Sequence, residues 1–407
     1  MPFQKNFLKG FGSAAIHSGH VPESNNSHIT PVYASSTYVF DSADQGMRRF
    51  NGEEKGYIYS RWGNPTMAEA ERKISALESL GLEENGLPLQ LKTILNSSGM
   101  AAISALLLGI LKPGDKILTH FSLYGGTQEL MDKVLPQLGI EAVIVDLRNK
   151  AKAEEVLKNN SNLKLLYLET PANPTIQCVD IEELTQLARK YNLLVAVDNT
   201  FATPFLQQPF KYGVDFILHS TTKFLNGHGT AIGGAIVGKN LEFMNGRMEK
   251  VHRLLGGNSN SFDAFLLTQG MKTLEVRMER HCANAMEVAK YLEKHKSVAK
   301  VNYLGLPSHP DFLIANKQMK HPGAMMSFEL KGGLQSGKNF IDKLQMCVRA
   351  VSLGTCDTLL SHPASMTHFG VPKEKREQYG ISDSLIRMSV GIENLEDILN
   401  DLEQALN

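Results

Sequence analysis

The stretch that decides the fold is VAVDNTFATPFLQQPFKYGVDFILHSTTKFLNGHGTAIGG, residues 195–234. Leu193–Val197 is apolar without alternation, which is typical of a strand buried on both faces, and Asp198 follows it directly. Phe216–Leu218 is a second short apolar run, and it leads into a polar turn that ends at Lys223. The pattern predicts neighbouring buried strands that carry polar groups at their carboxyl ends.

The polar residues of this stretch suit a pyridoxal phosphate (PLP) cofactor. A carboxylate at Asp198 can face a protonated pyridine nitrogen and keep the ring an electron sink. The hydroxyls of Ser220 and Thr222 suit a phosphate, and Lys223, with glycines after it, is placed to form a Schiff base. Each feature alone has an ordinary explanation, since Asp caps helices and Ser and Thr cluster in turns. Their joint occurrence favours a PLP site.

The chain resembles the Cys/Met-metabolism (trans-sulfuration) family of PLP enzymes in motifs spread over nearly its whole length. The motifs are Tyr57–Arg61 (YIYSR), Gly63–Thr66 (GNPT), Ser98–Ala102 (SGMAA), Tyr124–Thr127 (YGGT), Glu169–Pro174 (ETPANP) and His362–His368 (HPASMTH). The family includes cystathionine γ-synthase, the cystathionine lyases, methionine γ-lyase and the O-acylhomoserine sulfhydrylases. The resemblance implies an α/β protein of PLP fold type I, the aspartate-aminotransferase-like fold.

The composition is that of an enzyme acting on small molecules. With 407 residues the chain exceeds one ordinary core, and Lys plus Arg equal Asp plus Glu at 42 each. This balance gives no bulk attraction to nucleic acid or membranes. The N-terminus lacks an apolar core of signal-peptide length, and no 18-residue apolar run appears anywhere in the sequence. The four cysteines are scattered, which predicts neither disulfides nor a metal site. We expect a cytoplasmic protein without nucleic-acid or membrane partners.

Three parts are predicted along the chain. Residues 1–62 show little periodicity and read as an extended N-terminal arm that contacts a neighbouring subunit. Residues 63–262 alternate helical patterns with apolar runs, which indicates a large PLP-binding domain with a mostly parallel sheet. Residues 263–407 open with a long helical segment through Glu293 and end in the amphipathic stretch Leu395–Leu406, and they form a smaller α+β C-terminal domain.

The individual elements of the large domain follow from the same patterns. Helical patterns and apolar runs are predicted at Met67–Leu80, Lys92–Leu95, Ala101–Leu111, Lys116–Thr119, Ala142–Val145, Lys164–Leu168 and Ile181–Tyr191. Glu83–Leu91 is predicted to be a loop.

Two further segments are predicted to bind the cofactor phosphate. A glycine at a helix N-terminus lets the backbone approach an anion, so Gly99 and Met100 are expected to donate their N–H groups. Tyr59 and Arg61 are two apart in an extended segment and point the same way, and a phenol with a guanidinium makes a phosphate clamp. The resemblance implies that this pair reaches the neighbouring subunit's phosphate, which makes the dimer catalytic and the assembly a homotetramer.

The substrate residues are predicted mainly by the resemblance. Tyr124 matches the tyrosine that stacks on the PLP ring and exchanges protons with the leaving group, although a loop tyrosine is the ordinary alternative. Arg387 lies among apolar residues, where an unpaired charge is costly, so it needs an anion. The resemblance implies an α-carboxylate, bound with the help of Ser352 and Asn173, and a structural ion pair is the alternative.

The choice of reaction depends on few residues. Val351 stands where cystathionine-handling relatives commonly have Glu, and this favours γ-elimination on methionine or homocysteine to 2-oxobutyrate, ammonia and a thiol. Gly126, His252–Arg253 and Gly256–Asn260 depart from the methionine γ-lyase pattern. The alternative is γ-replacement on O-acetyl- or O-succinylhomoserine, by a sulfhydrylase or cystathionine γ-synthase. An inactive PLP-binding protein or an aminotransferase fits the retained motifs less well.

Overall fold

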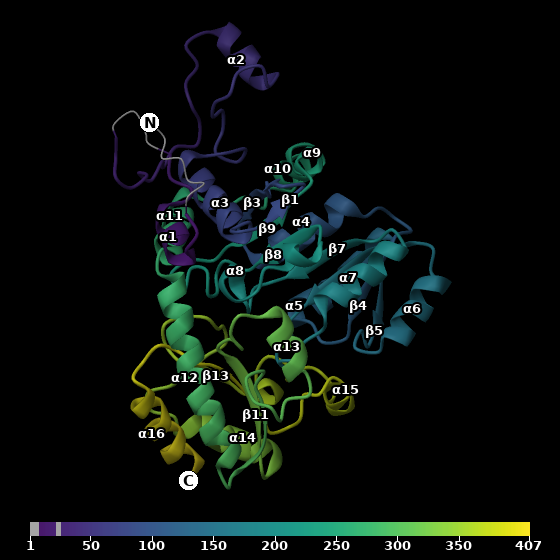
Figure 1. The fold of residues 1–407 in the computed structure, drawn as a ribbon, viewed down its shortest axis with the longest axis vertical. Helices are drawn as coiled ribbons and strands as arrows, with labels where there is room; N and C mark the ends of the chain where they lie inside the picture. The colour runs from purple at the N-terminus through teal and green to yellow at the C-terminus, as the bar shows by residue number, and fades with distance from the viewer. Residues whose placement is uncertain (1–7, 22–25) are drawn as a thin grey trace. The chain divides into compact units, whose positions relative to one another are not determined.

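The computed structural model describes residues 8–21 and 26–407, which form an α/β fold (Figure 1). Residue contacts divide the chain into two compact units. The first unit comprises Met1–Ile110, Leu218–Thr222 and Thr230–Thr273, and the second comprises Leu111–Ile217, Lys223–Gly229 and Leu274–Asn407. Residues 1–7 and 22–25 of the predicted arm lie outside the described residues. Within the described part of the chain, no helix has the length and apolar character needed to cross a membrane.

The larger sheet has seven strands in the order β3-β9-β8-β7-β6-β4-β5. Its strands are β3 (Lys92–Asn96), β4 (Lys116–His120), β5 (Glu141–Val145), β6 (Leu163–Glu169), β7 (Leu194–Asp198), β8 (Phe216–His219) and β9 (Gly234–Gly238). Strand β4 is parallel to both β5 and β6, and β6 is parallel to β7, whereas β3 pairs antiparallel with β9. Nearly every residue of β6, β7 and β8 is buried, as in a sheet covered on both faces. The predicted mostly parallel sheet is confirmed.

Helices lie before, between and after these strands in the sequence. They are α3 (Pro65–Glu78), α4 (Gly99–Ile110), α5 (Gly125–Glu129), α6 (Lys150–Asn159), α7 (Ile181–Lys190), α8 (Thr203–Leu206), α9 (Leu241–Phe243) and α10 (Glu249–Leu255). Of these, α3, α6, α7 and α9 begin at capping side chains. The side chain of Asn64 accepts a hydrogen bond from Thr66 N–H, and Pro65 opens α3. Asp180 caps α7 by accepting from Glu183 N–H.

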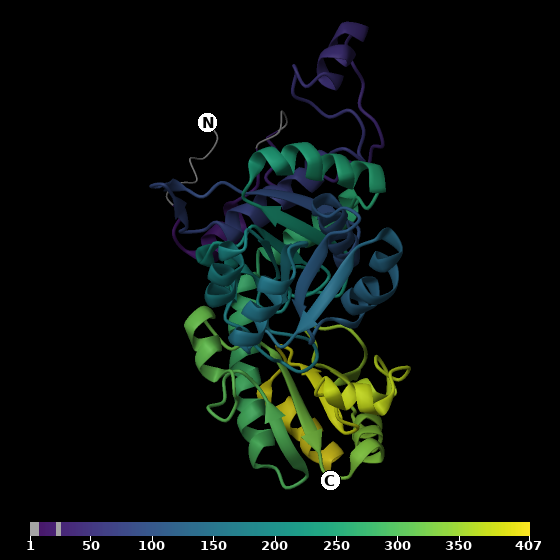
Figure 2. The same cartoon turned by 90° about the vertical axis from the view of Figure 1, so that its right-hand side faces the viewer.

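The smaller sheet lies in the second unit and has the order β10-β11-β14-β13-β12. Its elements are β10 (Val298–Asn302), β11 (Met325–Leu330), β12 (Val348–Arg349), β13 (Leu359–Ser361) and β14 (Leu385–Ser389), with α12 (Leu274–Lys294), α13 (Phe312–Gln318), α14 (Gly333–Lys343), α15 (Lys373–Gln378) and α16 (Leu395–Leu406). One apolar core joins Leu292, Phe328, Phe340, Ile386 and Leu402 from α12, β11, α14, β14 and α16. Figure 2 shows the yellow C-terminal helix beside these strands. The expected α+β character is confirmed.

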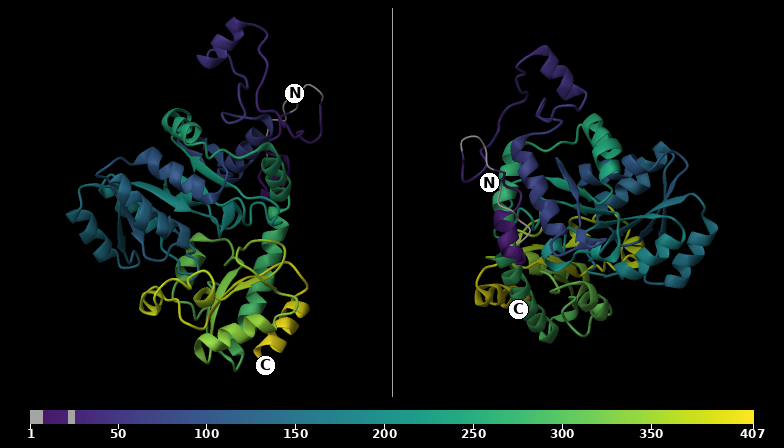
Figure 3. Two further views of the ribbon diagram at one scale, coloured as in Figure 1. Left: turned by 180° about the vertical axis from the view of Figure 1, so that it is seen from behind. Right: turned by 45° about the horizontal axis from the view of Figure 1, so that its top comes forward.

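The N-terminal part contains two short helices that the sequence patterns did not predict. Helix α1 (Phe11–His17) packs on α3 with Ala14 and Ala15 buried. Helix α2 (Ala43–Phe50) begins at Ser42, whose side chain accepts from Gln45 N–H. In Figure 3 the segment with α2 stands away from the other elements of the first unit. Val39 is 90% exposed there, and ion pairs of Arg48 and Arg49 with Glu54 hold the segment together.

Two predicted elements are wrong in detail. Glu83–Leu91 was expected to be a loop, but Glu83–Glu84 and Leu87–Pro88 pair as the hairpin β1–β2. Asn85 and Gly86 both have positive φ and make its two-residue turn. The long helical segment through Glu293 is divided, since α11 (Ser261–Met271) ends before α12 begins. The hydrogen bonds from Lys272 N–H to Gln269 O and from Thr273 N–H to Gly270 O tighten the chain at this break.

Candidate active site

Lys223 lies four residues beyond β8 and is half-buried. Its Nζ donates a hydrogen bond to Ser352 Oγ at 2.9 Å. Burial and the positive charge of Arg387 lower the pKa of Lys223 to about 8. The amine is therefore deprotonated far more readily than an ordinary lysine, as covalent chemistry with an aldehyde requires.

The turn at Ser352 packs against the chain just after Lys223. Gly354 has φ +75, and a Cβ on it would lie 2.6 Å from the backbone nitrogen of Phe224. Ser352 itself has φ 102, an uncommon conformation for a residue with a side chain, and such strain concentrates at functional sites. On the other side, Arg277 Nη1 donates to Phe224 O at 2.9 Å. The segment that carries Lys223 is thus held on both sides.

Arg387 lies in β14 with 7% of its surface exposed. Its Nη2 donates to Ser352 O at 2.7 Å and its Nη1 to Asn173 Oδ1 at 3.3 Å, while its buried Nε has no hydrogen-bond partner. Burial lowers its pKa to about 10. No carboxylate of the described chain pairs with it, so the predicted alternative of a structural ion pair is wrong. A buried guanidinium with neutral partners suits an anion such as an α-carboxylate.

Asp198 ends β7 and lies opposite Glu169, the last residue of β6. The Asp198 carboxylate accepts from Thr200 N–H at 3.0 Å, from Thr200 Oγ1 at 2.5 Å and from Tyr167 Oη at 3.5 Å. Burial raises the pKa of Tyr167 well above its usual value, so this phenol stays a neutral donor. Asp198 therefore has neutral donors around it, which suit an ionised carboxylate.

Tyr124 directly precedes α5 and has 48% of its surface exposed. Its N–H donates to Glu169 Oε2 at 2.8 Å, and the N–H of Asn173 donates to Glu169 Oε1 at 3.1 Å. Burial and the charge of Asp198 raise the pKa of Glu169 to about 8. Sequence reasoning missed Glu169, although the ETPANP motif begins with it at the end of a predicted strand.

The predicted phosphate-binding residues Gly99 and Met100 open α4 in the first unit. A Cβ on Gly99 would lie 2.9 Å from the Cβ of Ser220, so only glycine permits this approach. Thr222 Oγ1 accepts from Gly233 N–H at 3.0 Å and donates to Gly233 O at 3.2 Å. Ser220 thus lies beside the helix N-terminus, whereas the hydroxyl of Thr222 bonds the backbone, and phosphate binding by both stays a prediction.

The residues that depart from the methionine γ-lyase pattern support this turn. His252 Nδ1 bonds Asn96 Oδ1 at 3.0 Å, and burial lowers the pKa of His252 to about 4, which keeps it neutral. Ser97 N–H donates to Gly257 O at 2.7 Å. His252 and the loop from Gly256 onward therefore hold the backbone just before Gly99.

Tyr59 and Arg61 lie together, with the Arg61 guanidinium 5.5 Å from the centre of the Tyr59 ring. Arg61 Nη1 donates to Arg253 O at 2.7 Å, and Tyr59 is 42% exposed. Their reach to a neighbouring subunit stays a prediction.

The structure thus places the predicted residues in two groups, one in each unit. Gly99 and Met100 with Ser220 and Thr222, and the pair Tyr59 and Arg61, belong to the first unit. In the second unit, hydrogen bonds link Lys223, Ser352, Arg387 and Asn173, and Glu169 joins Asn173 to Tyr124 beside Asp198.

Comparisons with known proteins show the family to which the chain belongs. The family model described as Cys/Met metabolism PLP-dependent enzyme matches residues 12–407. An L-methionine gamma-lyase of Fusobacterium nucleatum subsp. nucleatum is 48% identical over 398 residues, covering 98% of each chain. An L-methionine gamma-lyase of Porphyromonas gingivalis is 44% identical, covering 98% of this chain and 97% of that protein. The crystal structure of metB from Corynebacterium glutamicum superposes with a TM-score of 0.89 at 39% identity, covering 100% of this chain and 99% of that one.

Proposed function

Because the chain belongs to the Cys/Met metabolism family of PLP-dependent enzymes, we propose that it catalyses γ-elimination on methionine or homocysteine. The products are 2-oxobutyrate, ammonia and a thiol. The observation that carries the proposal is the hydrogen-bonded row of Lys223, Ser352 and Arg387, which joins a reactive amine to a guanidinium suited to an α-carboxylate. The full-length similarity to L-methionine gamma-lyases supports a sulfur amino acid as the substrate.

The residues fit pyridoxal phosphate. We expect Lys223 to bind it covalently, Asp198 to pair with its pyridine nitrogen and Tyr124 to stack on its ring. Its phosphate is expected to bind Gly99, Met100, Ser220 and Thr222. The lowered pKa of Lys223 and the lack of room for a side chain at Gly99 are what this chemistry requires. When bound, the cofactor supplies an electron sink for negative charge at the substrate Cα.

Each protein group has a defined task in the elimination. Arg387 binds the substrate α-carboxylate with the help of Asn173 and Ser352, and this fixes the direction of the Cα–H bond. The Lys223 amine takes the proton from Cα, and a second deprotonation at Cβ follows. Tyr124 then gives a proton to the sulfur that leaves from Cγ. Asp198, which accepts hydrogen bonds from Tyr167 and Thr200, would pair with the pyridine nitrogen of the cofactor.

Val351 supports a thioether substrate over cystathionine. Its apolar side chain is 59% exposed and directly precedes Ser352, which bonds both Lys223 and Arg387. A thioether tail needs only apolar contact, whereas the distal ammonium of cystathionine needs a carboxylate partner. The residue at this position offers none.

A panel of substrates tests the proposal. Purified enzyme is incubated with methionine, homocysteine, or O-acetyl- or O-succinylhomoserine, with and without sulfide, and 2-oxobutyrate and new thioethers or thiols are measured. We expect 2-oxobutyrate from methionine or homocysteine without sulfide. Product that forms only from an O-acylhomoserine together with sulfide would establish γ-replacement instead.

The proposal includes an assembly in which the arm contributes to a neighbour's site. The segment around α2 stands away from its own unit, and Tyr59 is exposed, which supports a contact with another subunit. We propose a homotetramer built from two catalytic dimers. The division into arm (1–62), PLP-binding domain (63–262) and C-terminal domain (263–407) is part of the same proposal, and a cytoplasmic location stays a prediction.

A further inference from the structure

Glu169 is a buried carboxylate that the tasks above leave unused. Only 6% of its surface is exposed, and it ends β6 next to another carboxylate, Asp198, on β7. Burying a charge beside a like charge is costly unless hydrogen bonds compensate it. Two backbone N–H groups, those of Tyr124 and Asn173, offset only part of this cost, and the pKa of Glu169 stays raised.

Both carboxylate oxygens of Glu169 are engaged, each by a different segment. Oε2 accepts from Tyr124 N–H at 2.8 Å, at the start of α5, and Oε1 accepts from Asn173 N–H at 3.1 Å. Asn173 in turn accepts from Arg387 Nη1 through its side chain. One side chain therefore connects the segment of the expected proton donor to that of the expected carboxylate-binding pair.

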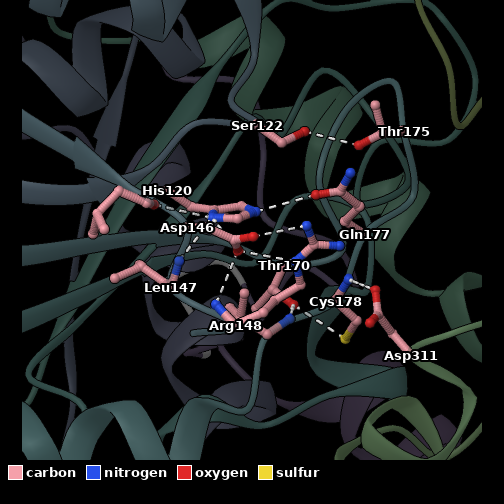
Figure 4. Close-up of polar contacts among 12 residues, drawn as sticks. His120, Ser122, Asp146, Leu147, Arg148, Thr170, Thr175, Gln177, Cys178 and Asp311 are labelled. Atoms are coloured by element: carbon pink, nitrogen blue, oxygen red, sulfur yellow. Dashed lines mark hydrogen bonds and ion pairs between the residues drawn. The ribbon is translucent and has the colours of Figure 1, made fainter. Parts of the chain in front are cut away.

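Further polar contacts hold the loop that follows Asn173 (Figure 4). His120 Nε2 bonds Gln177 Oε1 at 3.1 Å, and Ser122 Oγ bonds Thr175 Oγ1 at 2.8 Å. Cys178 N–H donates to Asp311 Oδ2 at 2.9 Å. The first two contacts join the segment before Tyr124 to the loop after Asn173, whereas the bond between Cys178 and Asp311 does not involve the segment before Tyr124, so Asp311 provides the control for loop stability alone.

We propose that Glu169 is a positioning residue that sets the backbones of Tyr124 and Asn173 together, so that proton donation and carboxylate binding depend on one side chain. The inference rests on the proposed roles of those two residues. Both acceptor oxygens are needed: a glutamine of the same shape keeps one acceptor, and its NH2 group would face the second N–H donor.

The test compares E169Q with D311A, which removes the acceptor of the Cys178 N–H in the same loop. We expect E169Q to lower kcat and to raise KM, with a combined loss in kcat/KM of about 5- to 100-fold from one unsatisfied buried donor. Its visible cofactor band should remain. D311A should lower the melting temperature and leave kcat and KM near those of the wild type. E169Q behaving like D311A would overturn the proposal.

A double-mutant cycle with Y124F, which keeps the N–H of Tyr124, separates positioning from stability. If Glu169 acts through Tyr124, the kcat loss in E169Q/Y124F should be smaller than the product of the two single losses. Strictly multiplicative losses would contradict the proposal. The cycle uses whichever substrate the wild-type enzyme turns over. If methionine is not a substrate, the wild-type assay shows this before the variants are compared, so the proposed function and the role of Glu169 are tested separately.

Discussion

The lowered pKa of Lys223 results from burial and from the neutral and cationic groups around it. Its Nζ bonds a hydroxyl, that of Ser352, and it lies in the field of Arg387, so the charged ammonium form is disfavoured. A carboxylate in the position of Ser352 would reverse this effect and raise the pKa of Lys223. The nucleophile and the carboxylate-binding group thus depend on each other at the level of single residues.

The first prediction concerns how pH controls uptake of the cofactor. Only the unprotonated amine adds to an aldehyde, and the pKa of Lys223 is lowered to about 8. Uptake of pyridoxal phosphate by apoenzyme should therefore accelerate about tenfold per pH unit below this value and level off above it. Stopped-flow absorbance across the pH range checks this. A rate that keeps climbing beyond pH 10, or uptake by K223A, would contradict the assignment.

The second prediction concerns Val351. Introducing a carboxylate with V351E gives the distal ammonium of cystathionine a partner, and such charge-assisted contacts are worth about 1.5–3 kcal/mol. The ratio of kcat/KM for cystathionine to that for methionine should rise about 10- to 100-fold. V351Q is the uncharged control. An equal rise of this ratio in both variants would show that the charge is not the cause.

Single residues also mark the limit of sequence reasoning. The need of Arg387 for an anion could be predicted from its apolar neighbours in the chain. The role of Glu169 could not, because one of its donors, Tyr124 N–H, is 45 residues away in sequence. A backbone N–H group is present in every residue except proline, so the sequence does not indicate which of them bonds a given carboxylate.

At the scale of elements, the N-terminus of α4 packs closely against the segment that contains Ser220. The turn from Asn96 is held by His252 and Gly257, and Gly99 faces Ser220 with no space for a methyl group. This construction makes the start of the helix sensitive to small changes in volume.

The third prediction follows from that packing. G99A places a Cβ 2.9 Å from that of Ser220, so the turn must shift, and the dissociation constant of pyridoxal phosphate should rise about tenfold. G246A is the control, because a Cβ there has nothing within 4 Å. Fluorescence titration of apoenzyme measures both. Equal affinities in the two variants would exclude Gly99 from phosphate binding.

Elements with strong periodicity could be predicted from the sequence, and those set by local turns could not. The apolar runs of β4, β6 and β7 and the amphipathic α16 end within two residues of the predicted bounds, because burial fixes their patterns. The hairpin β1–β2 was missed although Asn85-Gly86 is a turn signal, since its strands are exposed and carry no apolar alternation.

At the scale of the whole molecule, the fourth prediction is that two subunits share each site. R61A removes the proposed phosphate contact to the neighbour, and K223A removes the nucleophile. Each variant alone should be inactive, but mixed dimers contain one site with both residues intact. Partial activity, up to about a quarter of that of the wild type for random pairing, should return on subunit exchange. Demonstrated exchange with no return of activity would show that each chain builds its own site.

The most direct test of the whole account is the product formed from methionine alone. Arg387, Lys223 and Tyr124 together should release 2-oxobutyrate and ammonia in equal amounts, with methanethiol as the third product and no added thiol. We predict that the wild-type enzyme forms all three at the same rate and that K223A forms none. No 2-oxobutyrate from methionine, with the cofactor bound on Lys223, would contradict the assignment of this chain as a methionine γ-lyase.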